Sequence, residues 1–391
     1  MDIEQEIEQE LYRTLSYWES YAVDHDNGGF YGQRDQQNQL VKNAPKGSVL
    51  NSRILWTFSA AFKYTGEQKH FDLANRAYSY IKNYFYDKEN GGVYWSLDSK
   101  GVVLDTKKQT YALSFAIYGL SEYYSVSKDK DALDLAIDIF NTIEKYCFDP
   151  KDKGYFEAFG KDWTEIEDLR LSDKDANEKK TMNTHLHVLE AYTNLYRYWK
   201  NDRLKDQLKE LLLVFENHII NPKSDHLNLF MDEFWRYKEQ IYSFGHDIEA
   251  SWLLQEAAEV LGKEDILKRI KSQALKLVYA AKEGLLPDGS LIYESNADTK
   301  HNIQEKHWWV QAEALVGFYN AFQLTNEETF YNHFEQVWKF IKEHILDYEN
   351  GEWFWGVDEK NNVMPGEDKL GLWKCPYHNI RACLEILHRK S

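Results

Sequence analysis

The chain has 391 residues, of which 43% are hydrophobic and 15% aromatic, enough apolar material for a large core. Its net charge is −17 and no basic run interleaves with aromatic residues, which argues against a nucleic-acid partner. Three scattered cysteines give neither a disulfide framework nor a zinc site, no apolar run is long enough to span a membrane, and the acidic N-terminus does not resemble a signal peptide. We therefore expect a soluble, cytoplasmic protein.

The pattern of apolar residues predicts helices over most of the chain, separated by short turns. Helical spacing appears in twelve segments, near residues 3–23, 51–65, 70–86, 109–126, 130–146, 183–200, 202–219, 246–261, 264–282, 308–324, 327–346 and 376–389. Turns rich in glycine, asparagine or aspartate precede the helix pairs and lead into short aromatic or apolar segments, as in Asn90-Gly91-Gly92-Val93-Tyr94-Trp95. We expect a short β-hairpin at each turn.

These turns recur at a near-constant period. They lie near positions 28, 91, 154, 226, 289 and 351, so successive turns are 63, 63, 72, 63 and 62 residues apart. A fixed period along a whole chain is typical of repeat architectures. No unit resembles a polar cap, so we expect an all-α (α/α)6 barrel of twelve helices with hairpins at its mouth, forming one domain over residues 1–391. An open solenoid is the alternative.

The helix that follows each turn is less charged than the next one. Residues 54–62 and 113–120 are largely apolar, whereas residues 263–276 carry several lysines. A helix that is apolar on most sides is buried, so we place the helix after each turn in the inner ring. The N-terminal ends of these inner helices then face the same mouth as the hairpins.

Polar, titratable and aromatic residues stand at the starts of all six inner helices. They include Arg53, Tyr111, Asn183 with His185 and His187, His246 with Asp247 and Glu249, Trp308 and Trp309 with Glu313, and Pro376 with His378. In a closed barrel these groups converge on one funnel, which makes the mouth the candidate active site. His187 shares a helix face with Asn183, four residues earlier, so we assign His187 to the funnel and leave His185 to packing.

Spacing also groups the residues of the fourth inner helix. His246 and Glu249 are three residues apart and share a face that Trp252 continues. A histidine beside a carboxylate and an aromatic ring is typical of an acid/base group next to a platform for a sugar. A helix N-terminus disfavours the imidazolium, so we expect His246 and His378 to stay neutral, the form that a general base needs.

Other chemistries remain open on these residues. Three histidines and a glutamate could bind zinc or manganese, although the sequence contains no HExxH motif. A glycoside hydrolase needs two facing carboxylates, for which Asp247, Glu249 and Glu313 are the candidates. Histidines at the best-placed positions instead favour proton transfer at a carbon next to a carbonyl. A sugar-binding protein without catalysis is a further alternative.

The motifs at the inner starts resemble those of the cellobiose 2-epimerases, a branch of the N-acylglucosamine 2-epimerase superfamily. The matching motifs are NSRILW (51–56), NTHLHVLEAYTNLYR (183–197), GHDIEASWLL (245–254), Trp308-Trp309 followed by Glu313, and WKCPYHN (373–379). The resemblance covers essentially the whole chain and implies the same (α/α)6 barrel. It implies epimerisation, without metal or cofactor, at C2 of the reducing-end glucose of a β-1,4-linked disaccharide such as cellobiose, lactose or mannobiose.

The resemblance also implies roles for individual residues. After ring opening, one of His246 and His378 removes the C2 proton, a cis-enediolate forms, and the other histidine returns a proton to the opposite face. Four matched residues hold the sugar or the developing oxyanion: His187, Arg53, Tyr111 and Asn183. Glu249 would form a hydrogen bond near the reducing end, and Trp309 and Trp373 would stack on the sugar rings, with Trp252 and Glu313 close by. Arg53 is always charged and, with donors from Tyr111 or His187, would stabilise the enediolate. The resemblance implies a monomer.

Two related reactions share this enediolate and stay open as alternatives: aldose–ketose isomerisation of mannose-type monosaccharides, and 2-epimerisation of N-acylated hexosamines. Paired Trp308 and Trp309 offer extra stacking surface and favour a disaccharide. The loop 160–180 is rich in aspartate, glutamate and lysine and makes the third interval the longest. It could be a lid over the mouth, but its composition favours a plain solvated loop.

Overall fold

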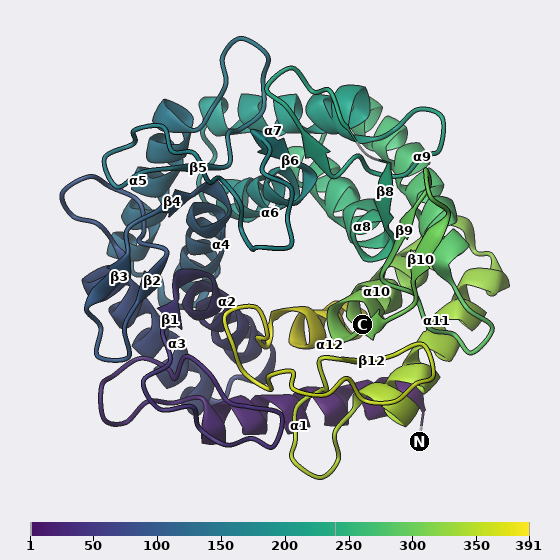
Figure 1. Ribbon diagram of the computed structural model, residues 1–391, viewed down its shortest axis with the longest axis horizontal. Coiled ribbons are helices and arrows are strands. Elements are labelled where there is room, and N and C mark those ends of the chain that lie inside the picture. The colour runs from purple at the N-terminus through teal and green to yellow at the C-terminus, as the bar shows by residue number, and fades with distance from the viewer. Residues whose placement is uncertain (1, 239, 391) are drawn as a thin grey trace.

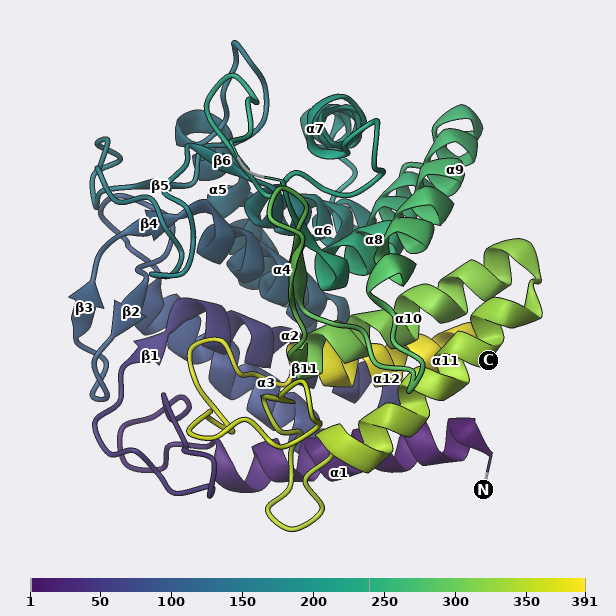
Figure 2. The same ribbon diagram turned by 45° about the vertical axis from the view of Figure 1, so that its right-hand side comes forward.

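The computed structural model describes residues 2–238 and 240–390, in which twelve α-helices form two concentric rings (Figures 1 and 2). The inner ring contains α2 (Ser48–Thr65), α4 (Thr110–Ser127), α6 (Met182–Tyr198), α8 (Phe244–Leu261), α10 (Trp308–Thr325) and α12 (Tyr377–Lys390). The outer ring contains α1 (Ile3–Tyr21), α3 (Gln68–Tyr80), α5 (Lys130–Tyr146), α7 (Asp202–Val214), α9 (Glu264–Ala281) and α11 (Glu328–Phe340). Successive inner helices pack together and α12 packs on α2, so the predicted barrel is confirmed and the open solenoid is wrong.

The two rings bury their residues as their composition predicts. Every residue of α4 from Thr110 to Tyr123 is buried. By contrast, α5 buries mainly one face, through Ala132, Ala136, Ile139, Phe140 and Ile143. This spacing is that of an amphipathic helix covering a core. In the described part of the chain, no helix is long and apolar enough to cross a membrane.

Three outer helices continue into a five-residue π-helical turn. These turns are η1 (Ile81–Phe85), η2 (Phe215–Ile219) and η4 (Ile341–Ile345), and they follow α3, α7 and α11 directly. The predicted segments 70–86, 202–219 and 327–346 therefore cover an α-helix and its π-helical ending. After α9 the chain forms a 3-10 turn instead, η3 (Lys282–Gly284).

Each repeat turn closes with one antiparallel bridge, which confirms the predicted hairpins. The six bridges are Val23–Phe30, Tyr86–Val93, Phe148–Tyr155, Ile220–Leu227, Leu285–Leu291 and Leu346–Trp353. The longer strand pairs connect neighbouring repeats, because the strand before an inner helix pairs with a strand that follows the next turn. A bridge between Arg34 and Leu370 joins the first and last repeats in the same way.

The strands that connect repeats are short. They pair as β1 (Lys46–Gly47) with β2 (Ser96–Leu97), β4 (Lys108–Gln109) with β5 (Ala158–Phe159), β6 (Lys180–Thr181) with β7 (Phe230–Met231), β8 (Ile241–Ser243) with β9 (Glu294–Asn296), and β11 (Lys306–His307) with β12 (Gly356–Val357). Two further strands, β3 (Val103–Asp105) and β10 (His301–Ile303), extend the first and fourth of these sheets. All five sheets adjoin the starts of inner helices, so they fix where those starts lie.

A buried lysine–aspartate ion pair recurs at four of the turns, a feature that the sequence analysis did not identify. The pairs are Lys46–Asp24, Lys108–Asp87, Lys180–Asp149 and Lys369–Asp347, each at 2.8 Å. Each aspartate also accepts hydrogen bonds from backbone N–H groups two and three residues further along its turn. In the first three pairs the lysine lies two residues before an inner helix, so the pair fastens the turn to the helix start.

We predict that Lys108→Met lowers the free energy of unfolding by about 3–5 kcal/mol, because it leaves the Asp87 carboxylate buried without its partner. Both side chains are fully buried. The change is measured by urea unfolding followed by circular dichroism. Lys82→Met is the control in the same repeat, since the Lys82–Asp131 pair is exposed, and it should cost less than about 1 kcal/mol. If the free energy of unfolding falls by the same amount in both variants, the buried Lys108–Asp87 pair is not the cause of the loss.

Candidate active site

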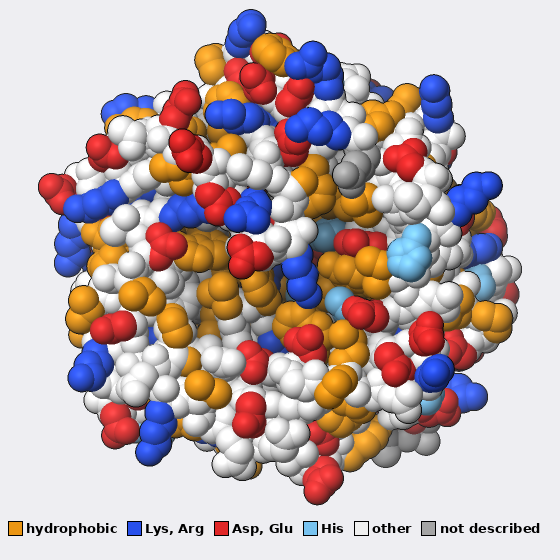
Figure 3. Space-filling model, in the orientation of Figure 1, with side chains coloured by type: hydrophobic (Ala, Val, Ile, Leu, Met, Phe, Trp, Pro, Cys, Tyr) orange, Lys and Arg blue, Asp and Glu red, His pale blue; other side chains and the backbone are white. Residues whose placement is uncertain are grey.

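The mouth of the barrel holds a cavity of about 360 Å³, which opens near the centre of the face shown in Figure 3. Nine of the predicted site residues line it: Arg53, Tyr111, Asn183, His187, His246, Glu249, Trp309, Trp373 and His378. These residues come from all six inner helices and from the segment before α12, as the convergence of helix starts requires. The aromatic walls are completed by Tyr293, Trp308 and Trp355.

Arg53 is a buried cation that has no carboxylate partner among the described residues. Its guanidinium donates to the Tyr111 hydroxyl at 2.7 Å and lies 3.5 Å from the Cys375 sulfur. It also lies over the rings of Phe115 and Tyr377, at 4.2 and 4.8 Å from their centroids. Because no carboxylate neutralises it, this charge is available to an oxyanion in the cavity.

A second buried guanidinium, that of Arg381 on α12, binds three carboxylates from three other inner helices. Its Nη1 donates to Glu190 on α6. Its Nη2 donates to Glu249 on α8 and to Glu313 on α10, at 2.6 Å each. All four side chains are almost completely buried, so one cation links four of the six inner helices just behind the cavity.

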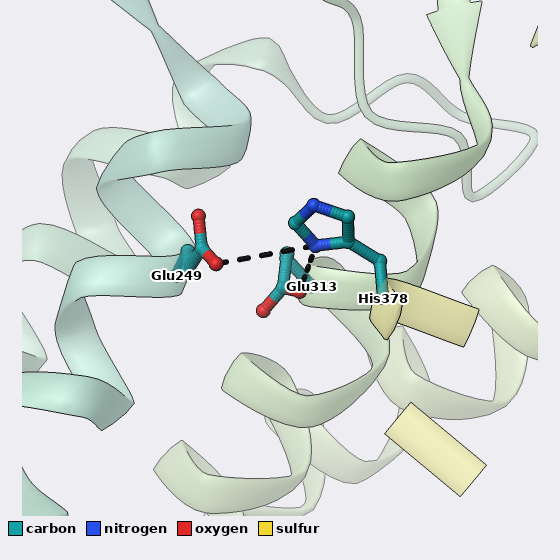
Figure 4. Close-up of side chains that lie close together, drawn as sticks. All are labelled: Glu249, Glu313 and His378. Carbon is teal, nitrogen blue, oxygen red and sulfur yellow. Dashed lines mark hydrogen bonds and ion pairs between the residues drawn. The ribbon is translucent and has the colours of Figure 1, made fainter. Parts of the chain in front are cut away.

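Two of these carboxylates orient histidines of the cavity. The Nδ1 atom of His378 lies 2.7 Å from Oε1 of Glu313, as Figure 4 shows, and Nδ1 of His187 lies 2.9 Å from Oε2 of Glu190. The other partners of Glu313 are the Arg381 guanidinium and the Trp252 indole, which can only donate. Burial raises the pKa of Glu313, but Arg381 opposes this shift and favours the carboxylate. With Glu313 ionised, Nδ1–H of His378 donates to it and the Nε2 lone pair stays free.

His246 is held differently, by the hydroxyl of Ser243. Its Nδ1 lies 2.7 Å from Ser243 Oγ, and its ring centroid lies 4.7 Å from that of Trp309. A hydroxyl can donate or accept, so neutral His246 can hold its proton on either ring nitrogen. Burial lowers the pKa of His246 to about 3. Burial, Arg53 and Arg381 together hold the pKa of His378 well below its ordinary value. The prediction of neutral histidines is supported, with burial as the main cause.

Glu249 is a further titratable group that lines the cavity. Burial and the neighbouring Glu313 carboxylate raise its pKa to about 7, against the opposing effect of Arg381. Its Oε1 binds Arg381, whereas its Oε2 is buried and has no hydrogen-bond partner among the described residues. This free oxygen is suited to accept a hydrogen bond from a hydroxyl group in the cavity.

Two residues predicted to bind the sugar lie behind the cavity instead. Trp252 and Glu313 are almost completely buried and are absent from its lining. The indole N–H of Trp252 donates to Glu313 Oε2 at 3.1 Å, and its ring lies beside the Arg381 guanidinium. Trp252 lies on the same helix face as His246, as the spacing predicts. It is, however, six residues further along α8 and therefore deeper in the barrel than the mouth. The prediction that Trp252 and Glu313 lie at the substrate is therefore wrong, and both residues instead support the cavity from behind.

The interpretation of residues 160–180 as a plain solvated loop is also wrong in part. Residues 171–175 line the cavity. The backbone oxygen of Arg170 accepts hydrogen bonds from Lys107 Nζ at 2.8 Å and from Gln109 Nε2 at 2.9 Å. The neighbouring repeat thus anchors the loop so that it forms one wall of the site.

Sequence reasoning missed Arg381 and Glu190, although a signal for both was present. Arg381 follows His378 by three residues, and Glu190 follows His187 by three residues, which places each pair on one helix face. His185 lies where the spacing predicts, outside the cavity, and its Nε2 accepts from the backbone N–H of Tyr155. No comparable signal marks Tyr293 or Trp355, which reach the cavity from loops.

The close group of Glu249, Glu313 and His378 needs to be considered as a metal site, because their ligand atoms lie within 4.8 Å of one another (Figure 4). Both carboxylates, however, already accept from the Arg381 guanidinium at 2.6 Å. A divalent cation there would lie beside a fixed positive charge and compete with it for the same oxygens. This donor set is a poor fit for a divalent cation.

Comparisons with known proteins agree with this geometry. The model of the N-acylglucosamine 2-epimerase (GlcNAc 2-epimerase) family matches residues 28–382. A cellobiose 2-epimerase from Bacteroides fragilis is 50% identical over 386 residues, and one from Ruminococcus albus is 42% identical over 387 residues, each alignment covering 98% of both chains. The crystal structure of a sugar epimerase from a ruminal bacterium superposes with a TM-score of 0.96 at 40% identity and 100% coverage of both chains. The resemblance inferred from the motifs is confirmed, and the chain belongs to the N-acylglucosamine 2-epimerase family.

Proposed function

We propose that this protein is a cellobiose 2-epimerase, which interconverts glucose and mannose at the reducing end of β-1,4-linked disaccharides. The observation that carries the proposal is a pair of neutral histidines, the half-buried His246 and the buried His378, on one cavity beside Arg53, a cation with no carboxylate partner among the described residues. The Trp309 ring lies close to both histidines, with centroid distances of 4.7 and 5.7 Å. Relatives that are 42–50% identical along the whole chain and carry this activity support it.

The chemistry requires one base on each face of C2. Once the sugar ring is open, a proton next to the aldehyde is weakly acidic, and a neutral imidazole can remove it. Arg53 and the Tyr111 hydroxyl stabilise the enediolate that forms, because a preorganised cation and donor favour the developing negative charge. His378 has its Nε2 lone pair free, and His246 can carry a proton on Nε2. One histidine removes a proton and the other supplies one to the opposite face, which inverts C2.

The cavity walls support a disaccharide substrate. Flat rings of Trp309, Trp355 and Trp373 line it beside a few polar groups, the usual composition of a site for a ligand with apolar faces and hydroxyl groups. His187, Asn183 and Glu249 are placed to bind hydroxyl groups. The motif resemblance further supports a metal- and cofactor-independent monomer. The repeat pattern supports one catalytic domain over residues 1–391, and composition and charge support action in the cytoplasm without a nucleic-acid partner.

A glycoside hydrolase is the candidate from another class, and the geometry disfavours it. Of Asp247, Glu249 and Glu313, only Glu249 lines the cavity. Asp247 accepts from the Leu227 backbone N–H at 2.9 Å and lies 2.7 Å from His226 Nδ1. The predicted candidates therefore offer no pair of carboxylates that face each other across a bond. Mannose isomerisation and N-acylhexosamine epimerisation use the same histidines and are separated by product analysis.

The first test is incubation of EDTA-treated protein with cellobiose in D₂O, followed by NMR and sugar chromatography. We expect glucosylmannose with deuterium at C2, because the abstracted proton exchanges with the histidine and solvent. Free glucose would show hydrolysis and contradict the proposal. A ketose as the main product would favour the isomerase. Loss of activity with EDTA and its recovery with a divalent metal would overturn the metal-free scheme.

The second test replaces the two histidines separately. His246→Ala and His378→Ala should each lower kcat by at least about 10³-fold, because removing either base blocks proton transfer on one face. His301→Ala, at an exposed histidine outside the cavity, is the matched control and should keep normal activity. Thermal unfolding shows whether each variant is folded. Near-normal turnover in either cavity variant would refute the two-base mechanism.

The third test follows the pH dependence of kcat/KM. The pKa of Glu249 is raised to about 7, so its carboxylate forms as the pH rises through that value, and we expect kcat/KM to rise with it. His246 has a pKa of about 3 and contributes no change in this range. Glu249→Gln should lower activity and remove the transition near pH 7. If the variant keeps the same transition, Glu249 is not the group responsible.

A further inference from the structure

A second cavity lies at the opposite end of the barrel from the catalytic mouth. Its volume is about 410 Å³, which falls in the range of about 300–1,000 Å³ typical of small-molecule sites. The C-terminal halves of five inner helices line this far-end cavity, through residues that include Trp56, Tyr118, Asn194, Arg197, Glu256 and Glu385. The proposed epimerisation uses none of these side chains.

Two aromatic residues of the far-end cavity each carry a polar group that has no hydrogen-bond partner among the described residues. Trp56 and Tyr118 are 7% and 8% exposed, and their rings stack at a centroid distance of 5.3 Å. Neither the indole N–H of Trp56 nor the hydroxyl of Tyr118 forms a hydrogen bond with another residue that the structure describes. Neither atom is among the enclosed unpaired polar atoms, so both donors open onto the cavity, where they can bind a ligand that carries acceptor oxygens.

The charges around the far-end cavity favour a neutral ligand. Arg197 binds Glu256 at 2.6 Å and Lys63 binds Glu122 at 3.2 Å, so acidic and basic groups largely balance in pairs. The inner helices end here, and helix C-termini carry partial negative charge. An anion would be repelled by these ends and by Glu385. A molecule with many hydroxyl groups can instead bind both the cationic and the anionic groups without burying a charge.

Glu190 connects the far-end cavity with the catalytic one. It lines the far-end cavity, and its Oε2 lies 2.9 Å from Nδ1 of His187, which lines the catalytic cavity. Burial opposes its ionisation, but Arg381 and His187 hold the pKa of Glu190 at about 2, so it stays charged. A ligand that binds next to Glu190 therefore touches the group that orients His187.

We propose that the far-end cavity is a second saccharide site, which binds a neutral sugar ring and is coupled to His187 through Glu190. Trp56 and Tyr118 supply the aromatic wall and two donors. Arg197, Glu256 and Asn194 supply further hydrogen-bonding groups. This inference does not rest on the proposed epimerase activity, because the binding site is separate from the catalytic cavity.

The test uses the full chain labelled with 5-fluorotryptophan and titrated with methyl β-glucopyranoside, a sugar whose ring cannot open and react. The fluorine NMR resonances of Trp56 and Trp309 are assigned with Trp56→Phe and Trp309→Phe. They report separately on the far-end and catalytic cavities. We expect the Trp56 resonance to shift along a saturable binding curve.

Two cavity variants and one control establish that the Trp56 response comes from local binding. Arg197→Gln should weaken the Trp56 titration by about tenfold and leave that of Trp309 unchanged, because it removes a charged donor from the far-end cavity only. Arg203→Gln, at an exposed arginine outside the cavity, is the matched control and should alter neither titration. Ala60→Phe should abolish the Trp56 response by filling the cavity. The proposal is overturned if the Trp56 resonance does not shift with added sugar. It is also overturned if, in Arg197→Gln, the Trp56 and Trp309 resonances follow the same titration curve.

Discussion

The contact between Arg381 and the carboxylates of Glu190, Glu249 and Glu313 is the interaction on which the active site depends. Three carboxylates buried this close together would repel one another strongly in a medium of low dielectric constant. One guanidinium from α12 reduces that repulsion, and its planar donors set the angle at which each carboxylate leaves its helix. Clusters of this kind contribute less to stability than to a defined geometry.

The carboxylates in turn fix the orientation of two histidines of the cavity. Glu313 and Glu190 fix the Nδ1 atoms of His378 and His187, in the way that a supporting carboxylate orients an imidazole elsewhere in proteins. Burial and the two arginines keep His378 neutral, so its imidazole can accept a proton at neutral pH without first losing one. Arg53 is the contrasting case. It is buried against aromatic rings and has no acidic partner in the described part of the chain, so its positive charge is available to the cavity at the mouth.

The repeat architecture brings these groups together. Strands that join neighbouring repeats and the buried lysine–aspartate pairs hold the starts of the inner helices at one end of the barrel. The opposite end, where the inner helices finish, forms a separate cavity, and Glu190 links it to the carboxylates behind the catalytic cavity. The closed ring therefore has one cavity at each end of its axis. The helix dipoles of the inner ring all point the same way, so the catalytic cavity faces positive helix N-termini and the far-end cavity faces negative C-termini.

Local periodicity in the sequence determined the helices, their order, the assignment of inner and outer rings, and eight residues of the cavity, because these follow from which residues avoid water and which share a helix face. The ninth residue, Trp373, was assigned only through the family resemblance. The same spacing could have identified Glu190 and Arg381. Only the tertiary structure decided the depth of each side chain along the barrel axis. In the folded protein, Trp252 and Glu313 lie behind the cavity, and residues 171–175 form part of its wall. It also decided the protonation of the histidines and of Glu249, since desolvation and the charges of neighbouring helices exist only after the ring has closed.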